Sequence, residues 1–179
     1  MLEDEWLKWK LRHGSPDALA RVYEKYVDTM LTLAMGLLNQ RAAAEDVVQD
    51  VFLSFARSAK DLRAQGSLRS YLATCVLNRV RDNRRQRQRQ ARRDAELGVS
   101  AESAGPEQAA ILVEETARLN QAVAQLPDEQ REVVLLRLKA NLKFRDIAKL
   151  QQTSINTVLG RYRYGLDRLR SQLNGEVEP

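Results

Sequence analysis

The sequence predicts an all-α protein of two small helical domains, residues 1–93 and 109–179, joined by an acidic flexible linker, residues 94–108. Apolar residues recur at three- and four-residue steps along most of the chain, which is the spacing of one helix face. No segment shows the period-two alternation that is typical of a strand. The linker is rich in alanine, glutamate, serine and glycine, with four acids and no base, so it is too polar to pack.

In the first domain the earliest predicted helix begins at Ser15-Pro16, because a serine hydroxyl caps a helix and proline fits its first turn. Its apolar stripe continues to Leu38, and Asn39-Gln40 interrupts it. A second helix is expected over about residues 41–59. Valine and phenylalanine lie on one side of this helix, and the opposite side carries the polar residues Glu45, Asp46, Gln49 and Asp50.

Gly66-Ser67 breaks the chain and begins a third helix, whose apolar positions include Leu68, Leu72, Cys75, Val76 and Val80. A polar side chain recurs every four residues on another face of this helix, at Ser70, Thr74, Asn78, Asp82 and Gln86. Tyr71 lies next to Arg69 at the helix start. An aromatic ring beside polar and cationic groups suits the stacking of an unpaired base, but a place in the core explains Tyr71 equally well.

In the second domain, helical spacing resumes at Ile111 and restarts at Pro127. Two short helices over about 143–151 and 154–172 then predict a helix-turn-helix, with Ser154 capping the second of them. Phe144, Ile147, Ala148, Val158, Tyr162, Leu166 and Leu169 are expected to pack inward, and Ile155, Asn156, Leu159, Gly160 and Arg163 to face outward. The turn position that favours a positive φ falls on Gln152. An ordinary helical hairpin would show the same bare spacing.

The charges are divided into blocks, although the net charge is only +5. Residues 71–93 carry eight arginines and one acid, six of the arginines between Arg84 and Arg93, and residues 133–179 are also basic. Residues 94–132 carry nine acids against two bases. A single charge run is usually only a solvated helix face. Two basic blocks around an acidic one favour a protein that holds a polyanion at two places, and nucleic acid is the leading candidate.

Composition also narrows the class of protein. The single cysteine, Cys75, excludes an internal disulfide and any multi-cysteine zinc site. The chain shows no signal peptide and no apolar run near the ~20 residues that span a bilayer, so we expect a cytoplasmic protein without membrane insertion. Neither a phosphate loop nor metal-ligand spacing is present, so no cofactor and no metal site are expected.

Four segments in order resemble the extracytoplasmic-function (ECF) group of bacterial sigma factors. Residues 44–52 (AEDVVQDVF) are similar to the group's signature helix, and residues 67–72 (SLRSYL), with Asn78 and Asp82, to its −10 recognition and strand-opening helix. Residues 126–133 (LPDEQREV) open what looks like its −35-binding domain. Ile147-Ala148 and Asn156-Thr157-Val158, with Arg161, fall where that domain's recognition motif falls.

The resemblance implies a transcription initiation factor that binds core RNA polymerase, recognises −35 and −10 promoter elements and promotes strand opening, without being an enzyme. Its implied partners are the clamp region of the polymerase largest subunit, double- and single-stranded promoter DNA, and an anti-sigma protein. The implied polymerase-binding residues are Glu45, Asp46, Gln49 and Asp50. The implied −10 residues are Arg63, Ser67, Tyr71, Thr74, Asn78, Arg79, Arg84 and Arg85. The implied −35 residues are Arg145, Ser154, Ile155, Asn156, Thr157, Gly160, Arg161 and Arg163.

Two other classes of protein were weighed against this interpretation. A helix-turn-helix regulator that never touches polymerase would explain residues 126–172, but it would leave the helix of residues 44–52 without a purpose. An enzyme would have to use His13 or Cys75, the only conventional nucleophile or base candidates. These two residues lie on separate segments, and core packing or solvent exposure explains them better.

Overall fold

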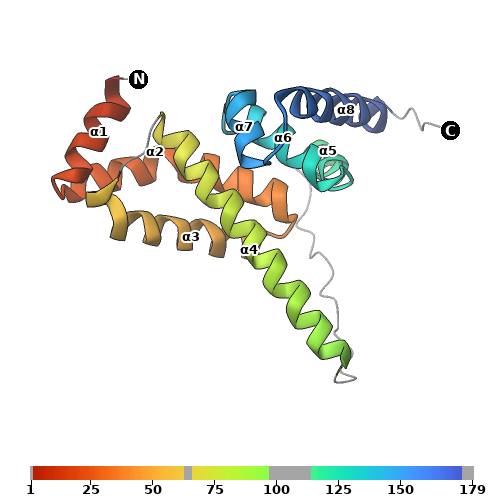
Figure 1. Ribbon diagram of the computed structural model, residues 1–179, viewed down its shortest axis with the longest axis horizontal. Coiled ribbons are helices and arrows are strands. Elements are labelled where there is room, and N and C mark those ends of the chain that lie inside the picture. The colour runs from red at the N-terminus through yellow and green to blue at the C-terminus, as the bar shows by residue number, and fades with distance from the viewer. Residues whose placement is uncertain (1, 63–65, 97–113, 175–179) are drawn as a thin grey trace.

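The computed structural model describes residues 2–62, 66–96 and 114–174 (Figure 1). These residues form eight α-helices and one short 3-10 helix, and they contain no strand, which confirms the predicted all-α class. The elements are α1 (Leu2–Arg12), α2 (Pro16–Leu38), α3 (Arg41–Ser58), η1 (Ala59–Asp61), α4 (Leu68–Glu96), α5 (Glu114–Ala124), α6 (Asp128–Leu138), α7 (Phe144–Leu150) and α8 (Ile155–Asn174).

The first half of the chain is a bundle in which α2, α3 and α4 pack against one another and α1 packs on α2. α2 begins as the sequence predicts, because Ser15 Oγ accepts the Ala18 amide at 3.3 Å and Pro16 occupies the first turn. The helix ends at Asn39, which takes a positive φ of 52°. Helix α1 is an element that the sequence reasoning did not predict, and Leu7 and Leu11 bury its apolar side.

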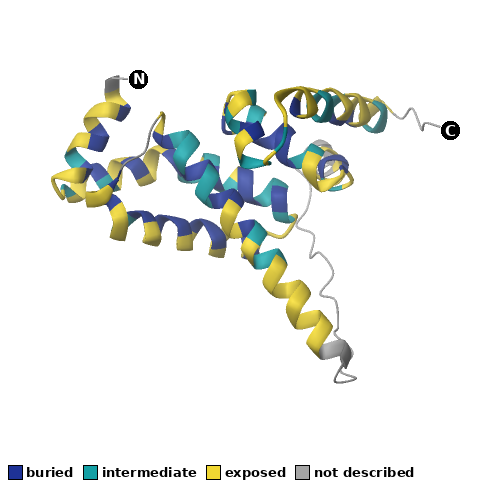
Figure 2. Cartoon of the chain, viewed as in Figure 1, coloured by how far each residue is buried: buried dark blue, intermediate teal, exposed yellow. Residues whose placement is uncertain are grey.

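Helix α4 has a first part that packs into the bundle and a second part that is exposed to solvent. Its first part packs into the bundle through Leu68, Leu72, Val76 and Val80, whereas from Arg85 onward its side chains are exposed up to Arg93 (Figure 2). At 29 residues the helix is ~43 Å long at 1.5 Å per residue. The arginine-rich segment therefore projects from the bundle at the end of a long helix (Figure 1).

The second half is built from α5 to α8, and the predicted helix-turn-helix is confirmed in α7 and α8. Ile147, Val158 and Leu169 are buried between the helices. Gly165 lets α8 approach α6 closely, because a Cβ at this position would lie 2.9 Å from Val134 Cγ2. Gln152 takes a positive φ of 52° in the turn, so the chain adopts the helix-turn-helix bend there without glycine.

The two halves of the chain contact each other, an arrangement that the sequence left open. α2 contacts both α5 and α6, so the buried apolar residues of the two halves form one cluster. Helices α2 and α6 approach closely at Gly36, where a Cβ would lie 2.9 Å from both methyl carbons of Leu135. A larger side chain at position 36 would therefore require Leu135 or its helix to shift.

Candidate polymerase and nucleic-acid interfaces

The polar side of α3 is exposed, as predicted from its spacing. Glu45, Asp46, Gln49 and Asp50 all face solvent, while Val47 on the opposite side is fully buried. Glu45 accepts a hydrogen bond from Arg41 at 2.7 Å, one turn earlier on the same helix. α3 therefore presents an acidic and amide-bearing face on a rigid element.

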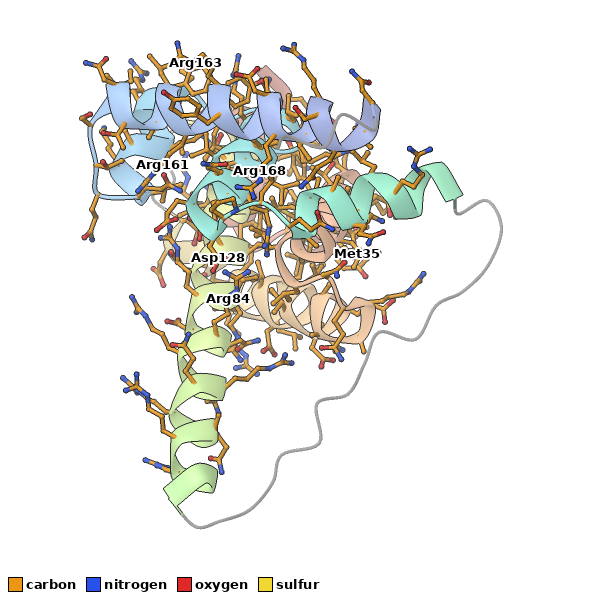
Figure 3. All side chains as sticks on the ribbon, turned by 90° about the vertical axis from the view of Figure 1, so that its right-hand side faces the viewer. Met35, Arg84, Asp128, Arg161, Arg163 and Arg168 are labelled. Atoms are coloured by element: carbon orange, nitrogen blue, oxygen red, sulfur yellow. The ribbon has the colours of Figure 1, made fainter. Side chains whose placement is uncertain are left out.

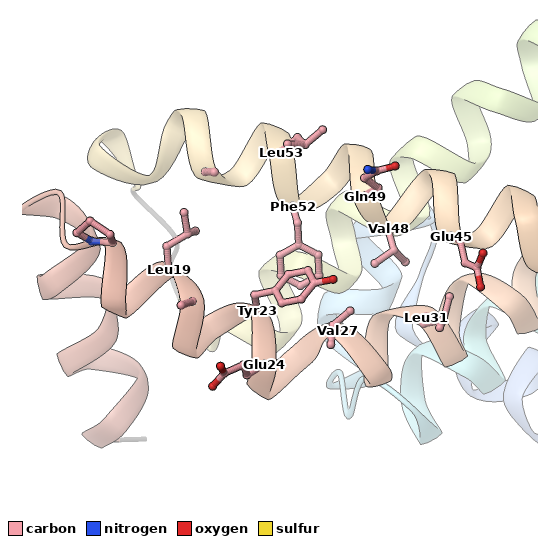
Figure 4. A pocket seen from close by; sticks show the side chains of 13 residues that line it. Leu19, Tyr23, Glu24, Val27, Leu31, Glu45, Val48, Gln49, Phe52 and Leu53 are labelled. Atoms are coloured by element: carbon pink, nitrogen blue, oxygen red, sulfur yellow. The ribbon is translucent and has the colours of Figure 1, made fainter.

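An apolar groove of about 710 Å³ lies beside this face, between α2 and α3 (Figure 4). Tyr23 and Leu53 line it and are about half exposed, at 49% and 50%. The Tyr23 ring meets Phe52 edge-on, with 4.9 Å between the ring centroids. Glu45 and Gln49 also line the groove, so the polar face and the apolar groove form one continuous surface. An exposed apolar patch with a polar rim is typical of a protein-binding site.

The sequence reasoning missed the groove, because it assigned Tyr23 to the inward apolar stripe of the first helix. Tyr23 does lie on that stripe, but at its edge, where it lines the groove between α2 and α3. One signal was present in the sequence. Leu53 follows Gln49 by four residues, so it is a large apolar side chain on the otherwise polar side of the helix.

Three of the predicted −10 residues, Tyr71, Asn78 and Arg79, line a second groove of about 480 Å³ between α3 and α4. Ser67 caps the helix by accepting the Ser70 amide at 3.1 Å, as predicted. Tyr71 is half buried with its ring 6.0 Å from that of Phe55, and burial raises the pKa of its hydroxyl. Tyr71 thus belongs partly to the core and partly to the groove, which combines the two interpretations that the sequence left open.

Asn78 and Arg79 lie about two turns after Tyr71 on α4, and both are exposed. Arg79 donates two hydrogen bonds to Asp50 Oδ2, at 3.1 Å from Nε and 2.5 Å from Nη2. An implied DNA-binding residue and an implied polymerase-binding residue therefore form one ion pair between α4 and α3. Thr74 donates its hydroxyl proton to the Ser70 carbonyl at 2.8 Å. Arg63 lies outside the described residues.

The two halves are linked where α4 passes α6. Arg84 donates to the Leu37 carbonyl at 2.7 Å and lies 2.9 Å from Asp128 Oδ2, and the two side chains lie close together in Figure 3. One turn earlier, Arg81 forms a two-pronged ion pair with Glu132, which is 6% exposed. Arg85 is exposed, with Asp82 3.9 Å away on the same helix. Arg84 therefore contacts a group from each half of the chain, Leu37 of α2 and Asp128 of α6.

The predicted −35 residues gather at the amino end of α8. Ser154 accepts the Thr157 amide at 3.1 Å and so caps the helix, as predicted. Ile155, Asn156 and Thr157 are exposed, and Gly160 is half exposed. Val158 is fully buried behind them, which confirms the predicted division into inner and outer sides. The first turn of α8 therefore exposes an amide, a hydroxyl and an apolar side chain, which are groups that can contact base edges.

Three arginines surround this turn. Arg161 is half exposed and donates to Gln151 Oε1 at 2.8 Å, so its guanidinium is held beside the turn of the motif. Arg163 is exposed and lies over the Tyr164 ring, 5.1 Å from its centroid. Arg145 on α7 is exposed with Asp146 3.7 Å away. In Figure 3 Arg163 lies on the side of α8 that faces away from α4, whereas Arg161 lies below the helix, toward α7 and α4.

The two residues weighed for an enzyme show no catalytic arrangement. His13 lies beside the Trp9 carbonyl, 2.7 Å from Nδ1, after the end of α1. Cys75 lies on α4, and burial raises the pKa of its thiol, which disfavours the nucleophilic thiolate. The described residues hold no cluster of histidine, cysteine and carboxylate side chains that could bind a metal ion. No helix in the described part of the chain is long and apolar enough to cross a membrane.

Two family models match the chain in the order that this architecture requires. The model of Sigma-70 region 2 matches residues 22–90, which run from α2 to the arginine-rich part of α4. The model of Sigma-70 region 4 matches residues 116–167, which include the helix-turn-helix. The fold and these surfaces define a sigma factor, which directs RNA polymerase to promoters and is a non-enzymatic initiation factor.

The chain is also similar to sigma factors of about the same length. The RNA polymerase sigma-H factor of Pseudomonas aeruginosa is 25% identical over 99% of this chain and 95% of its own. The ECF sigma factor SigW of Bacillus subtilis is 24% identical over 92% and 93%, and the ECF sigma factor RpoE of Cereibacter sphaeroides is 26% identical over 90% of each. The chain belongs to the ECF group of sigma factors.

Solved structures of sigma factors share the fold. CnrH, solved in complex with the cytosolic domain of CnrY, superposes with a TM-score of 0.70 at 22% identity, over 98% of this chain and 99% of CnrH. RpoE of Bartonella quintana, solved with the anti-sigma factor NepR, gives a TM-score of 0.69 at 22% identity, over 84% and 95%. The arrangement of helices is therefore one that known sigma factors adopt.

Proposed function

We propose that core polymerase binds the surface formed by the polar face of α3 and the apolar groove between α2 and α3. The observation that carries this proposal is the half-exposed pair Tyr23 and Leu53, next to the exposed residues Glu45, Asp46, Gln49 and Asp50. A groove of this size suits a helical partner such as the polymerase clamp, with apolar contacts in the centre and polar contacts at the rim. The binding energy would come mainly from the aromatic and aliphatic centre.

For the −10 element, we propose that the outer side of α4 holds the separated strand. Tyr71 supplies a ring edge in the groove, and Asn78 and Arg79 supply a hydrogen-bonding amide and a cation on successive positions. Such a combination binds single-stranded nucleic acid by stacking and charge. Ser67, Thr74, Arg84 and Arg85 on the same helix, and Arg63 before it, complete the proposed −10 set.

For the −35 element, we propose that the amino end of α8 enters the major groove. Asn156 and Thr157 would contact base edges, Ile155 would contact a thymine methyl group, and Gly160 would allow close approach. Arg161, Arg163 and Arg145 would contact phosphates, together with Ser154 at the helix start. The supporting observation is that Ile155, Asn156 and Thr157 are exposed at the start of α8, while Val158 is buried behind them.

Promoter binding by both surfaces requires the two halves to separate. The −10 and −35 elements lie about 25 base pairs apart by their names, which is ~85 Å at 3.4 Å per base pair. In the structure α2 and α6 are in contact, and Arg84 is held by Leu37 and Asp128. We therefore propose that this arrangement is a closed form and that residues 94–108 link domains 1–93 and 109–179 when it opens.

We further propose that a separate anti-sigma protein binds this chain and that the protein acts in the cytoplasm. Support comes from the two solved relatives, since one was solved with an anti-sigma factor and the other with a cytosolic domain of a partner protein. The surface that such a partner would cover is the polymerase-binding surface defined above, because one occupant then excludes the other.

The test is co-elution with bacterial core RNA polymerase in the absence of DNA, followed by run-off transcription from a promoter library. Asp50→Arg and Leu53→Asp should each weaken polymerase binding while the helical content stays unchanged. Asp61→Arg, the same change of charge on an exposed acid of η1, is the matched control and should bind normally. Wild-type affinity in both test variants would show that polymerase binds elsewhere. Promoter binding without polymerase binding would favour a free regulator.

A further inference from the structure

Helix α1 holds the start of α4 through two buried charged residues that the assigned surfaces do not include. Asp4 and Lys8 lie one turn apart on α1, and their exposed fractions are 9% and 5%. α1 precedes the segment that the region 2 model matches, which begins at residue 22. Burying a charge is costly unless the group is paired and hydrogen-bonded. Two such residues on one short helix therefore require a structural explanation.

The Asp4 carboxylate receives hydrogen bonds from two other helices. Tyr26 on α2 donates to Oδ1 at 2.7 Å, and Lys25 donates to the same oxygen at 3.2 Å. The Leu68 amide, the first of α4, donates to Oδ2 at 3.0 Å. Burial alone would raise the pKa of Asp4, but these hydrogen bonds outweigh it, so its pKa lies below the ordinary value. Asp4 is thus a cap for α4 that comes from 64 residues away.

The Lys8 ammonium contacts the other side of the same backbone segment. It donates to the Gly66 carbonyl, and it lies 2.7 Å from Glu5 Oε1. Gly66 has a positive φ of 89°, a backbone conformation that glycine allows and that turns the chain into α4. Asp4 and Lys8 together bind the carbonyl before Ser67 and the amide after it.

Apolar packing does not explain this arrangement. Leu7 and Leu11 already bury α1 against the bundle, and such packing is non-directional. A carboxylate and an ammonium instead fix the position and orientation of two particular peptide groups. The residue between those groups is Ser67, the cap of α4, and Tyr71 follows one turn later. The segment that is fixed is thus the start of the proposed −10 surface.

We propose that Asp4 and Lys8 are positioning residues for recognition of the −10 element. They hold residues 66–68 so that Ser67 and Tyr71 present one defined surface to the separated DNA strand. Neither residue touches DNA in this proposal; both act through the backbone at the start of α4. The inference rests on the proposed −10 role of α4.

The test compares Lys8→Met and Asp4→Asn with the wild type in the full chain. Both variants keep the size of the side chain and remove its charge. Lys10→Met is the matched control, because it makes the same change on the same helix at a half-exposed lysine near the Trp6 ring, 5.2 Å from its centroid. The measurements are helical content, affinity for core polymerase, affinity of the chain for a −35 duplex, and permanganate reactivity of the −10 strand in the holoenzyme. A promoter library randomised in the −10 element reports base preference.

Both test variants should reduce −10 opening about tenfold, as expected when a hydrogen bond to a charged group is lost, and should flatten the −10 base preference. Polymerase and −35 affinities should stay within twofold, and Lys10→Met should behave as wild type. Unchanged −10 opening and preference in both variants would overturn the proposal, as would a parallel loss of folding or polymerase affinity, which would assign the pair to stability. A wild-type chain that opens no −10 element would instead refute the proposed function.

Discussion

The ion pair between Arg81 and Glu132 provides a test of the closed arrangement. Arg81 on α4 donates to both carboxylate oxygens of Glu132 on α6, at 3.1 and 2.5 Å, and to the Leu150 carbonyl at 3.0 Å. The Glu132 side chain is only 8% exposed, and that of Arg81 is 29% exposed. Arg81→Met would remove all three hydrogen bonds while keeping the aliphatic stem.

The size of the effect follows from what happens to Glu132. A buried carboxylate that loses its partner costs ~3–5 kcal/mol if it stays buried. Separation of the halves exposes Glu132 to water and removes this free-energy penalty, so we expect the variant to favour the open form. The lost hydrogen bonds are charge-assisted, which makes them strong, but Arg81 is partly exposed, which weakens them. We therefore expect the free energy of the closed form to rise by about 1.5–3 kcal/mol relative to the open form. The ratio of open to closed chains should rise roughly ten- to hundredfold.

The assay is electron-spin distance measurement between labels at exposed positions 24 and 168, in a Cys75→Ser background, with small-angle scattering of unlabelled protein. Arg81→Met should move population from a short to a long distance and raise the radius of gyration. Arg85→Met, one turn further along α4 and exposed, should leave both unchanged. Equal distance distributions in wild type and Arg81→Met would refute the reasoning, and so would a wild-type chain that is already fully open.

Three further predictions concern single residues. Arg161→Ala should weaken binding to a −35 duplex by about 1 kcal/mol and reduce its salt dependence, as measured by fluorescence anisotropy at several salt concentrations; an unaltered footprint would remove Arg161 from the interface. Gly165→Ala should destabilise the chain by about 1–2 kcal/mol in urea, because its Cβ would lie 2.9 Å from Val134 Cγ2, whereas Gly160→Ala, whose Cβ would lie 4.0 Å from Tyr164, should cause no loss. Because the pKa of Asp4 is lowered in the folded chain, its stabilising effect is present above the ordinary value of ~3.9 and is lost as pH falls through the folded value. Asp4→Asn should therefore show a smaller loss of stability than wild type as the pH falls below about 4, and parallel curves would contradict this.

Much of the fold could be predicted from local sequence signals. Ser15 and Ser154 cap helices where their hydroxyls and spacing indicate, and the predicted inward positions of α3 and α8 are buried or half-buried. The positive φ at Gln152 was also predicted, because a helix-turn-helix requires a positive φ at that turn position. These features depend on interactions between residues a few positions apart, so they can be predicted from the sequence alone.

Features that join distant segments were not predictable in this way. Helix α1 was not predicted, and its two buried charges are understood only when Leu68 and Gly66 are seen beside them. Tyr23 was predicted to be a core residue, because an apolar stripe on one helix does not show where a groove forms between that helix and its neighbour. Arg84 and Arg79 looked available for DNA, yet Asp128 and Asp50 pair with them across elements.

The sequence by itself determined the helices other than α1, their inner and outer sides and the helix-turn-helix, because periodicity and capping are properties of neighbouring residues. The class of protein followed from the resemblance of four segments to sigma factors. Only the tertiary structure decided that the halves meet at Gly36 and Leu135, that Arg81 pairs with Glu132, and that Asp4 and Lys8 hold the start of α4. Each of these contacts joins residues 50 or more positions apart, and burial and charge pairing over such separations depend on how the helices pack.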